Sequence, residues 1–204
     1  AIAIAQAEWL QLAGWKFSVA LATTLSVGAL LLGVLLYRPE WFDTLVVPTL
    51  VVATLAWILI GARLLLSGPQ PPRFHPTLSV VLAFLLPLAA WCAVVLLLRS
   101  GVVVLLSVFF IVWVADTAAY FAGRAFGKRK LAPQISPGKT WEGVTGGVLA
   151  AGLAAGLAAQ WLELPASRLV VLGVATALIS VLGDLTQSMF KRNVGLKDSG
   201  KLLP

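Results

Sequence analysis

Long, continuously apolar stretches separated by short charged segments dominate the chain. Six of them are long enough to cross a bilayer, and they cover residues 17–37, 42–66, 77–98, 102–122, 143–162 and 169–190. Each predicts a transmembrane helix, because a spanning helix needs about 20 mainly apolar residues and an open sheet cannot satisfy its backbone hydrogen bonds in lipid. The pattern therefore predicts an all-α fold, a polytopic integral membrane helical bundle with at least six transmembrane helices in this segment.

The composition excludes a water-soluble globular domain. Hydrophobic residues make up 60% of the 204 residues and charged residues only 11%, and the mean hydropathy is +0.97. Such a chain folds in a bilayer. Its one cysteine, Cys92, lies in an apolar run, so a disulfide within the chain and a cysteine-based metal site are both excluded. We expect Cys92 to face lipid or to fill a packing gap.

Basic residues collect on one side of the predicted topology. With six spans the connecting segments alternate sides, and the formal net charge is +7. One side carries twelve basic residues: Lys16, Arg63, Arg73, Arg124, Lys128, Arg129, Lys130, Lys139, Lys191, Arg192, Lys197 and Lys201. The other side carries Arg38, Arg99 and Arg168. By the positive-inside rule the first side is the cytoplasm, and we expect both visible ends of the chain to lie there.

Small residues recur at every fourth position of the fifth span. Gly143, Gly147, Ala151, Ala155 and Ala159 share one helix face. Small side chains let helix backbones approach closely in a membrane. The repeat therefore predicts a helix packing seam rather than a catalytic role for these glycines.

Two carboxylates lie inside predicted spans, Asp116 in the fourth and Asp184 in the sixth. An ionised group there is costly unless it is paired or faces a wet cavity, so such residues indicate function. Each lies six residues from the cytoplasmic end of its span, a depth of about 9 Å for both. Two acids at one depth could repel each other, share a proton or bind a cation. We prefer a Mg²⁺ site with Asp184 and Asp116 as ligands. The alternative for Asp116 is a structural acceptor for Tyr120 or for a nearby arginine.

A hydroxyl and a cation follow Asp184 along the same helix. Ser188 lies four residues further on and Lys191 seven, and these spacings place all three side chains on one face. Together they suit phosphoryl or nucleotidyl transfer, in which an enzyme mainly positions groups and neutralises developing negative charge. We therefore predict Asp184, Lys191 and Ser188 as the catalytic residues.

The connection between the fourth and fifth spans, residues 123–142, is basic and rich in glycine and proline, which disfavour a regular helix. Such a loop can fix topology or bind anionic lipid headgroups. Its stretch Ser136-Pro137-Gly138-Lys139-Thr140 is similar to the end of a phosphate-binding P-loop. Position 133 is proline where that motif needs glycine, and no strand is expected before it, so a P-loop is rejected.

The C-terminal half of the chain resembles one enzyme family, the phosphatidate cytidylyltransferases or CDP-diacylglycerol synthases. The likeness to their signature is carried by Ser188-Met189-Phe190-Lys191-Arg192, then after four residues Lys197-Asp198-Ser199-Gly200, and Leu203-Pro204. Further similar positions are Ala115-Asp116, Ala119-Tyr120, Gly123-Arg124, Phe126-Gly127 and residues 135–143. The resemblance covers at least residues 113–204.

The resemblance implies an enzyme that converts CTP and phosphatidic acid to CDP-diacylglycerol and pyrophosphate in phospholipid biosynthesis, with Mg²⁺ as cofactor. The expected partners are these substrates and membrane lipids, with no nucleic acid, and a homodimer is an open option. The expected location is a bacterial inner (plasma) membrane, with the active site facing the cytoplasm. In this scheme Asp184 holds the metal, Lys191 offsets charge on the pyrophosphate and Ser188 donates to a phosphate oxygen. Substrate-binding candidates are Lys139, Thr140, Arg124, Arg192, Lys197 and Asp198.

The chain begins at Ala1 without a methionine, in an apolar stretch through Ala7 that is too short to span. The family pattern, as the resemblance implies it, continues past residue 204 with Gly-His-Gly-Gly and a second metal-binding aspartate. We therefore expect the chain to be cut at both ends. Residues 1–16 would be the end of a truncated N-terminal helix and a cytoplasmic connection, and residues 17–122 the first four transmembrane helices. A basic cytoplasmic loop at 123–142 and the last two transmembrane helices at 143–190 would follow. Residues 191–204 would begin the truncated cytoplasmic signature segment.

Two other classes of function compete with the enzyme. A cation- or proton-coupled transporter could use the intramembrane aspartates, although a basic mouth would repel cations. A non-catalytic lipid-binding scaffold would explain the basic loop but would leave Asp184 without a role. Binding of CTP that depends on Mg²⁺ separates the enzyme from both.

Overall fold

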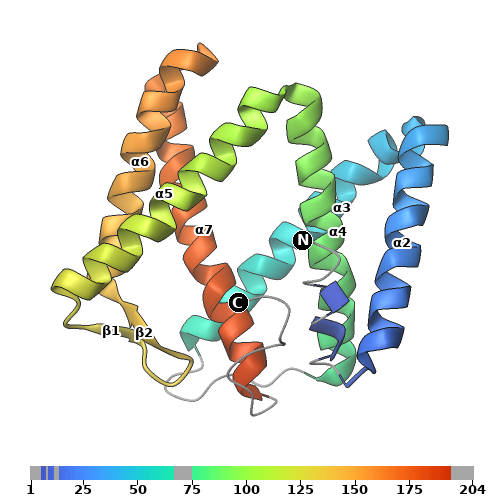
Figure 1. Ribbon diagram of the computed structural model, residues 1–204, viewed down its shortest axis with the longest axis horizontal. Coiled ribbons are helices and arrows are strands. Elements are labelled where there is room, and N and C mark those ends of the chain that lie inside the picture. Colours follow the sequence, from blue (N-terminus) through green and yellow to red (C-terminus); the bar gives the residue numbers. More distant parts are fainter. Residues whose placement is uncertain (1–5, 8, 12–13, 67–74, 194–204) are drawn as a thin grey trace. The chain divides into compact units, whose positions relative to one another are not determined.

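The computed structural model describes residues 6–7, 9–11, 14–66 and 75–193, and within them helices carry almost all of the regular structure (Figure 1). Among the described residues, six helices are long and apolar enough to cross a membrane: α2 (Phe17–Tyr37), α3 (Pro39–Leu66), α4 (Pro76–Ser100), α5 (Val102–Phe126), α6 (Trp141–Leu162) and α7 (Ala166–Asn193). Each predicted span falls on one of these helices. The prediction of an all-α, polytopic integral membrane protein is therefore confirmed.

Several helices extend beyond the apolar runs that predict them. Helix α5 continues four residues past position 122, and α7 exceeds the run 169–190 by three residues at each end. Backbone hydrogen bonds continue through polar residues, and basic side chains in the last turns of α5 and α7 complement the negative end of the helix dipole. A span read from hydropathy thus marks the lipid-facing part of a helix rather than its full length.

The chain forms two compact units. One contains α2, α3, most of α4 and the last residues of α7; the other contains the end of α4, α5, α6 and most of α7. In the first unit Phe42 and Val46 of α3 form a buried cluster with Cys92 of α4. The ring of Phe42 meets Trp91 edge-on, with centroids 5.6 Å apart. Cys92 is therefore a packing residue, which was one of its two expected roles.

A β-hairpin joins α5 to α6, where the sequence predicts an irregular basic loop. Its strands, β1 (Lys130–Ala132) and β2 (Ser136–Thr140), pair antiparallel with Lys130 opposite Thr140 and Ala132 opposite Ser136. Three residues of β1 face five of β2, so the pairing register shifts between Lys130 and Ala132. The stretch that is similar to a P-loop is thus itself strand β2. Strand β1 precedes it, so the expectation that no strand does so was wrong.

Hydrogen bonds fix the base of the hairpin to the start of α6. The Trp141 N–H donates to the Arg129 carbonyl oxygen at 3.0 Å, and the Arg129 N–H donates to both carboxylate oxygens of Glu142 at 3.2 Å. The Thr140 hydroxyl accepts from the Gly143 N–H at 3.2 Å and caps the helix. Because a two-stranded hairpin is marginal alone, these bonds to α6 orient it.

Helices α5 and α6 approach each other closely along the predicted seam. The five small residues of the repeat are all buried: Gly143, Gly147, Ala151, Ala155 and Ala159. A Cβ on Gly147 would lie 2.8 Å from the Ala115 carbonyl oxygen and 3.0 Å from the Ala119 Cβ. A Cβ on Gly143 would lie 2.8 Å from the Ala119 carbonyl oxygen. The predicted packing seam is therefore confirmed.

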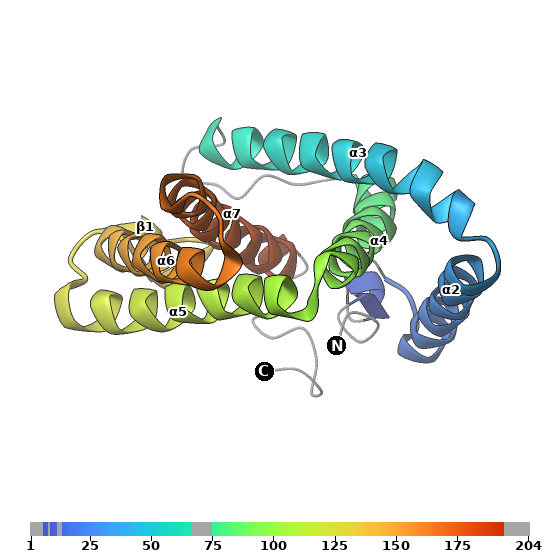
Figure 2. The ribbon, with the colours of Figure 1, turned by 90° about the horizontal axis from the view of Figure 1, so that it is seen from above.

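Helix α6 also packs closely against α7 (Figure 2). A Cβ on Gly173 of α7 would lie 2.6 Å from the Ala155 Cβ and 2.8 Å from the Ala151 carbonyl oxygen. Ile111 of α5 and Ala177 of α7 belong to the same buried cluster as these alanines. Helix α6 therefore holds α5 and α7 in one tightly packed group, and the hairpin adjoins it.

We expect Gly147→Ala to destabilise the protein and Gly152→Ala to leave it as stable or more so. Both glycines are buried in α6, and alanine adds roughly 1 kcal/mol of helix propensity at either one. The new Cβ meets the Ala115 backbone in the first variant, whereas in the second it lies 3.4 Å from a Val174 methyl group. The net loss for Gly147→Ala should be about 1–3 kcal/mol, measured by unfolding in detergent. Equal stability of the two variants would contradict the close backbone approach.

Candidate active site

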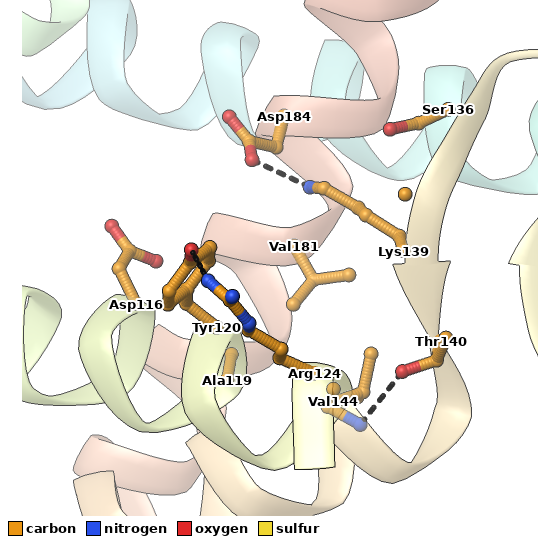
Figure 3. Close-up of a pocket in the computed structure, with 13 residues that line it drawn as sticks. Asp116, Ala119, Tyr120, Arg124, Ser136, Lys139, Thr140, Val144, Val181 and Asp184 are labelled. Atoms are coloured by element: carbon orange, nitrogen blue, oxygen red, sulfur yellow. Dashed lines mark hydrogen bonds and ion pairs between the residues drawn. The ribbon is translucent and has the colours of Figure 1, made fainter. Parts of the chain in front are cut away.

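A cavity of about 530 Å³ lies in the second unit, next to the hairpin (Figure 3). Its volume falls within the usual range of ligand pockets. Helices α5, α6 and α7 and strand β2 supply its lining: Asp116, Ala119, Tyr120, Gly123, Arg124, Ser136, Gly138, Lys139, Thr140, Gly143, Val144, Val181 and Asp184. The cavity therefore combines small backbone-exposing residues with a few charged ones.

An ion pair across the cavity joins the hairpin to α7. The Lys139 Nζ lies 2.6 Å from the Asp184 Oδ2, and Figure 3 shows the lysine side chain reaching from β2 toward the carboxylate. A carboxylate at this position in a span needs a counter-charge or a polar cavity. Asp184 has both, because Lys139 supplies the counter-charge and the Asp184 side chain, which lines the cavity, is 65% exposed. It therefore remains open to a ligand.

A second polar contact lies on α5. The Arg124 Nη1 donates to the Tyr120 hydroxyl oxygen at 3.0 Å. The expected alternative role for Asp116 was as an acceptor for Tyr120 or for a nearby arginine. The Tyr120 hydroxyl accepts from Arg124 in the structure, and its own O–H proton remains available to an acceptor. A guanidinium has five N–H donors, so this bond leaves Arg124 with further donors for an anionic ligand in the cavity.

Asp116 is exposed and lines the same cavity as Asp184. The Asp116 carboxylate lies near Asp184 and Lys139 in this lining and near the Ser180 hydroxyl of α7. The structure thus brings together the two intramembrane carboxylates that the sequence places at one depth.

The oxygen donors of the cavity fit a Mg²⁺ ion that a substrate helps to bind. This ion typically takes one or two carboxylates together with phosphate oxygens and water, and Asp116, Asp184 and the Ser136 hydroxyl are all in the lining. Among the described residues no group of three or more His, Cys, Asp and Glu side chains could hold a metal. Further ligands would therefore come from the substrate and from water.

The cavity gathers five of the predicted site residues: Asp116, Asp184, Lys139, Thr140 and Arg124. Among them Thr140 is buried, and its hydroxyl already accepts the N–H that caps α6. Thr140 therefore has a structural role in addition to its place in the lining.

Other predicted residues lie away from the lining. Ser188 follows Asp184 on α7 at the expected spacing, but it is not among the lining residues. Lys191 and Arg192 occupy the end of α7, which belongs to the other unit. Lys197 and Asp198 fall outside the residues that the structure describes.

Sequence reasoning missed two hydroxyls near the carboxylates, Ser136 and Ser180. Ser180 precedes Asp184 by four residues and so shares its helix face, by the same spacing argument that selected Ser188. Ser136 begins β2 and lines the cavity, but only the unpredicted hairpin brings it there.

The pattern that defines the Cytidylyltransferase family matches residues 1–204. The chain belongs to this family. A cytidylyltransferase relative from Haemophilus influenzae, named phosphatidate cytidylyltransferase, is 44% identical over 175 residues, which cover 76% of this chain and 60% of that protein.

A second relative with the same name comes from Pseudomonas aeruginosa. It is 41% identical over 204 residues, covering 97% of this chain and 73% of the relative. A third, from Staphylococcus epidermidis, is 42% identical over 107 residues, or 52% of this chain and 41% of the relative. The chain thus spans less than two thirds of the length of the Haemophilus relative and more than two thirds of the Pseudomonas one.

We expect the Lys139–Asp184 pair to contribute little to the stability of the folded protein. Because Asp184 is well exposed, the coupling free energy in a double-mutant cycle of Lys139→Met and Asp184→Asn should be at most about 1 kcal/mol. Thr140→Val removes a buried helix cap and should cost as much or more, about 1–2 kcal/mol. Unfolding in detergent measures the four proteins of the cycle and the Thr140→Val variant. A coupling above about 3 kcal/mol would instead indicate a buried structural ion pair.

Proposed function

We propose that this chain carries phosphatidate cytidylyltransferase activity, the formation of CDP-diacylglycerol and pyrophosphate from CTP and phosphatidic acid. The observation that carries the proposal is the cavity, in which two carboxylates and two cations converge next to the hairpin that links two transmembrane helices. Because the cavity lies beside the hairpin at the ends of transmembrane helices α5 and α6, it can receive both a water-soluble nucleotide and the phosphate of a membrane lipid. The names of the cytidylyltransferase relatives support the same reaction.

The reaction moves a cytidylyl group between phosphates. A phosphate oxygen of phosphatidic acid attacks the α-phosphorus of CTP, and an oxygen–phosphorus bond forms. The bond from that phosphorus to the bridging oxygen breaks, and pyrophosphate leaves with the electron pair. Negative charge therefore grows on the leaving group, and cations fixed nearby favour the transition state. Lys139 and Arg124 are the cations that line the cavity, and we assign them to the phosphates.

Asp184 and Asp116 would hold Mg²⁺, which supplies charge neutralisation at the phosphates when it is bound. Side chains of the protein would bind and orient the substrate phosphates. The Lys139 ammonium and the Arg124 guanidinium orient phosphate oxygens, and the Tyr120 hydroxyl accepts a hydrogen bond that holds the guanidinium in place. The Ser136 hydroxyl at the cavity wall is placed to donate to a phosphate or to a bound water.

We also propose roles for residues that follow Asp184. Ser188 would donate to a phosphate oxygen and Lys191 would offset charge on pyrophosphate, because both share the helix face of Asp184 on α7. Arg192, Lys197 and Asp198 are proposed to contact the nucleotide or the lipid headgroup.

The transporter alternative is not proposed. The two cations in the lining, Lys139 and Arg124, disfavour a pathway for cations, and no relative described above is named as a transporter. We propose that the cavity faces the cytoplasm of a bacterial inner membrane. The segment that leads from α5 into the hairpin carries the run Lys128, Arg129 and Lys130, on the side that the positive-inside rule assigns to the cytoplasm.

The test is pyrophosphate release from CTP by the detergent-solubilised protein, with phosphatidic acid in mixed micelles. Release should require both substrates and Mg²⁺, and Asp184→Asn should lower turnover at least about 100-fold, because the amide keeps the shape of the carboxylate and removes its charge. Glu163→Gln, an exposed position at the opposite end of α6 from the hairpin, is the matched control and should keep near-normal turnover. Near-normal turnover by Asp184→Asn at saturating Mg²⁺ would overturn the assignment of the site.

A further inference from the structure

The Asp184 carboxylate, a proposed metal ligand, already holds a cation in the described structure. The Lys139 ammonium lies 2.6 Å from its Oδ2, and the lysine side chain is only 24% exposed. It therefore lies along the cavity wall rather than in open solvent. A divalent ion bound to the same carboxylate would lie within a few ångströms of this ammonium, and the two cations would repel each other.

We propose that Lys139 is an exchangeable counter-ion of Asp184. A divalent metal that enters the cavity displaces the ammonium from the carboxylate, and the released ammonium pairs with phosphate oxygens of the nucleotide that arrives with the metal. This inference rests on the proposed function and adds a coupling to it. Through Lys139, the metal and the nucleotide each strengthen the binding of the other.

The charges of the cavity lining support joint entry. Asp116 and Asp184 are balanced by Lys139 and Arg124 among the described lining residues. A divalent ion alone would leave the cavity with excess positive charge and an ammonium without a partner. A nucleoside triphosphate that carries the metal brings net negative charge, which the displaced ammonium can neutralise.

The local structure lets the side chain move without the backbone. Lys139 lies in β2, next to Thr140, whose hydroxyl caps α6. The following Trp141 N–H bonds to the Arg129 carbonyl oxygen across the base of the hairpin. The backbone at Lys139 is therefore anchored on its C-terminal side, whereas the flexible four-carbon stem of lysine allows its ammonium to swing between two anionic partners.

Arg124 supplies a comparison within the same cavity. Its guanidinium bonds to the neutral Tyr120 hydroxyl at 3.0 Å, whereas the ammonium of Lys139 bonds to a carboxylate. Both side chains carry one positive charge and line the cavity. Removal of either one should weaken nucleotide binding, but only removal of Lys139 also frees a metal ligand.

The test is Mn²⁺ binding, followed by its paramagnetic resonance signal, with and without the α,β-methylene analogue of CTP. Without the analogue, Lys139→Met should bind Mn²⁺ about three- to tenfold more tightly than the wild type, because a competing ion pair of modest strength is gone. The analogue should raise the Mn²⁺ affinity of the wild type by a larger factor than that of Lys139→Met. By linkage, Mn²⁺ should raise the affinity for the analogue by the same factor in each protein.

Two further variants complete the design. Arg124→Met should change nucleotide-free Mn²⁺ affinity by less than about twofold, and Lys139→Arg, which keeps a cation opposite Asp184, should stay within about twofold of the wild type. An unchanged or weaker Mn²⁺ affinity of Lys139→Met overturns the inference, as does an equal gain in Arg124→Met, which would indicate general charge repulsion. Absence of Mn²⁺ binding to the wild type even with the analogue would overturn the proposed metal site together with this inference.

Discussion

An ionised carboxylate within a membrane-spanning helix must be compensated, and Asp184 meets that requirement through the Lys139 ammonium together with the polar cavity that it lines. The contact joins the hairpin between two helices to the last described helix, so it connects residues that are 45 positions apart in the chain. It is short but still open on one side, because Asp184 keeps 65% of its side-chain exposure. The same pair therefore helps to satisfy a membrane constraint and leaves open the polar cavity to which we assign the phosphates and a metal ion.

The cavity depends on close helix packing beneath it. Gly143 and Gly147 let α6 meet the α5 backbone at Ala119 and Ala115, and this approach sets the position of Asp116 and Arg124 relative to the start of α6. The start of α6 in turn anchors the hairpin through Glu142, Thr140 and the Trp141 N–H. A change in the seam would therefore move both walls of the cavity, which links a packing feature to the proposed chemistry.

Much of this arrangement could be predicted from the sequence, because it follows from local patterns. The apolar runs predict the six helices, the four-residue spacing of small side chains predicts the seam, and two acids at one depth predict a shared site. The hairpin could not be predicted in this way, since Arg129 and Glu142 stabilise it through contacts 13 residues apart and its strands are too short to show a pattern. The pairing of Lys139 with Asp184 depends on that hairpin, so sequence reasoning ranked Lys139 below Lys191. The helix spacing that links Ser188 and Lys191 to Asp184 was correct, but Ser188 does not reach the cavity lining.

The most direct test of this account is zero-length cross-linking with a water-soluble carbodiimide, which joins an ammonium to a carboxylate only when the two are in contact. The account predicts a Lys139–Asp184 amide link, identified by mass spectrometry of the digested protein, and no such link in Lys139→Arg, because arginine does not couple. An added small amine reports in parallel whether the Asp184 carboxylate is reactive. If Asp184 reacts with the added amine while Lys139 couples to a different carboxylate or to none, the hairpin does not hold Lys139 at Asp184, and the central contact of the structure is contradicted.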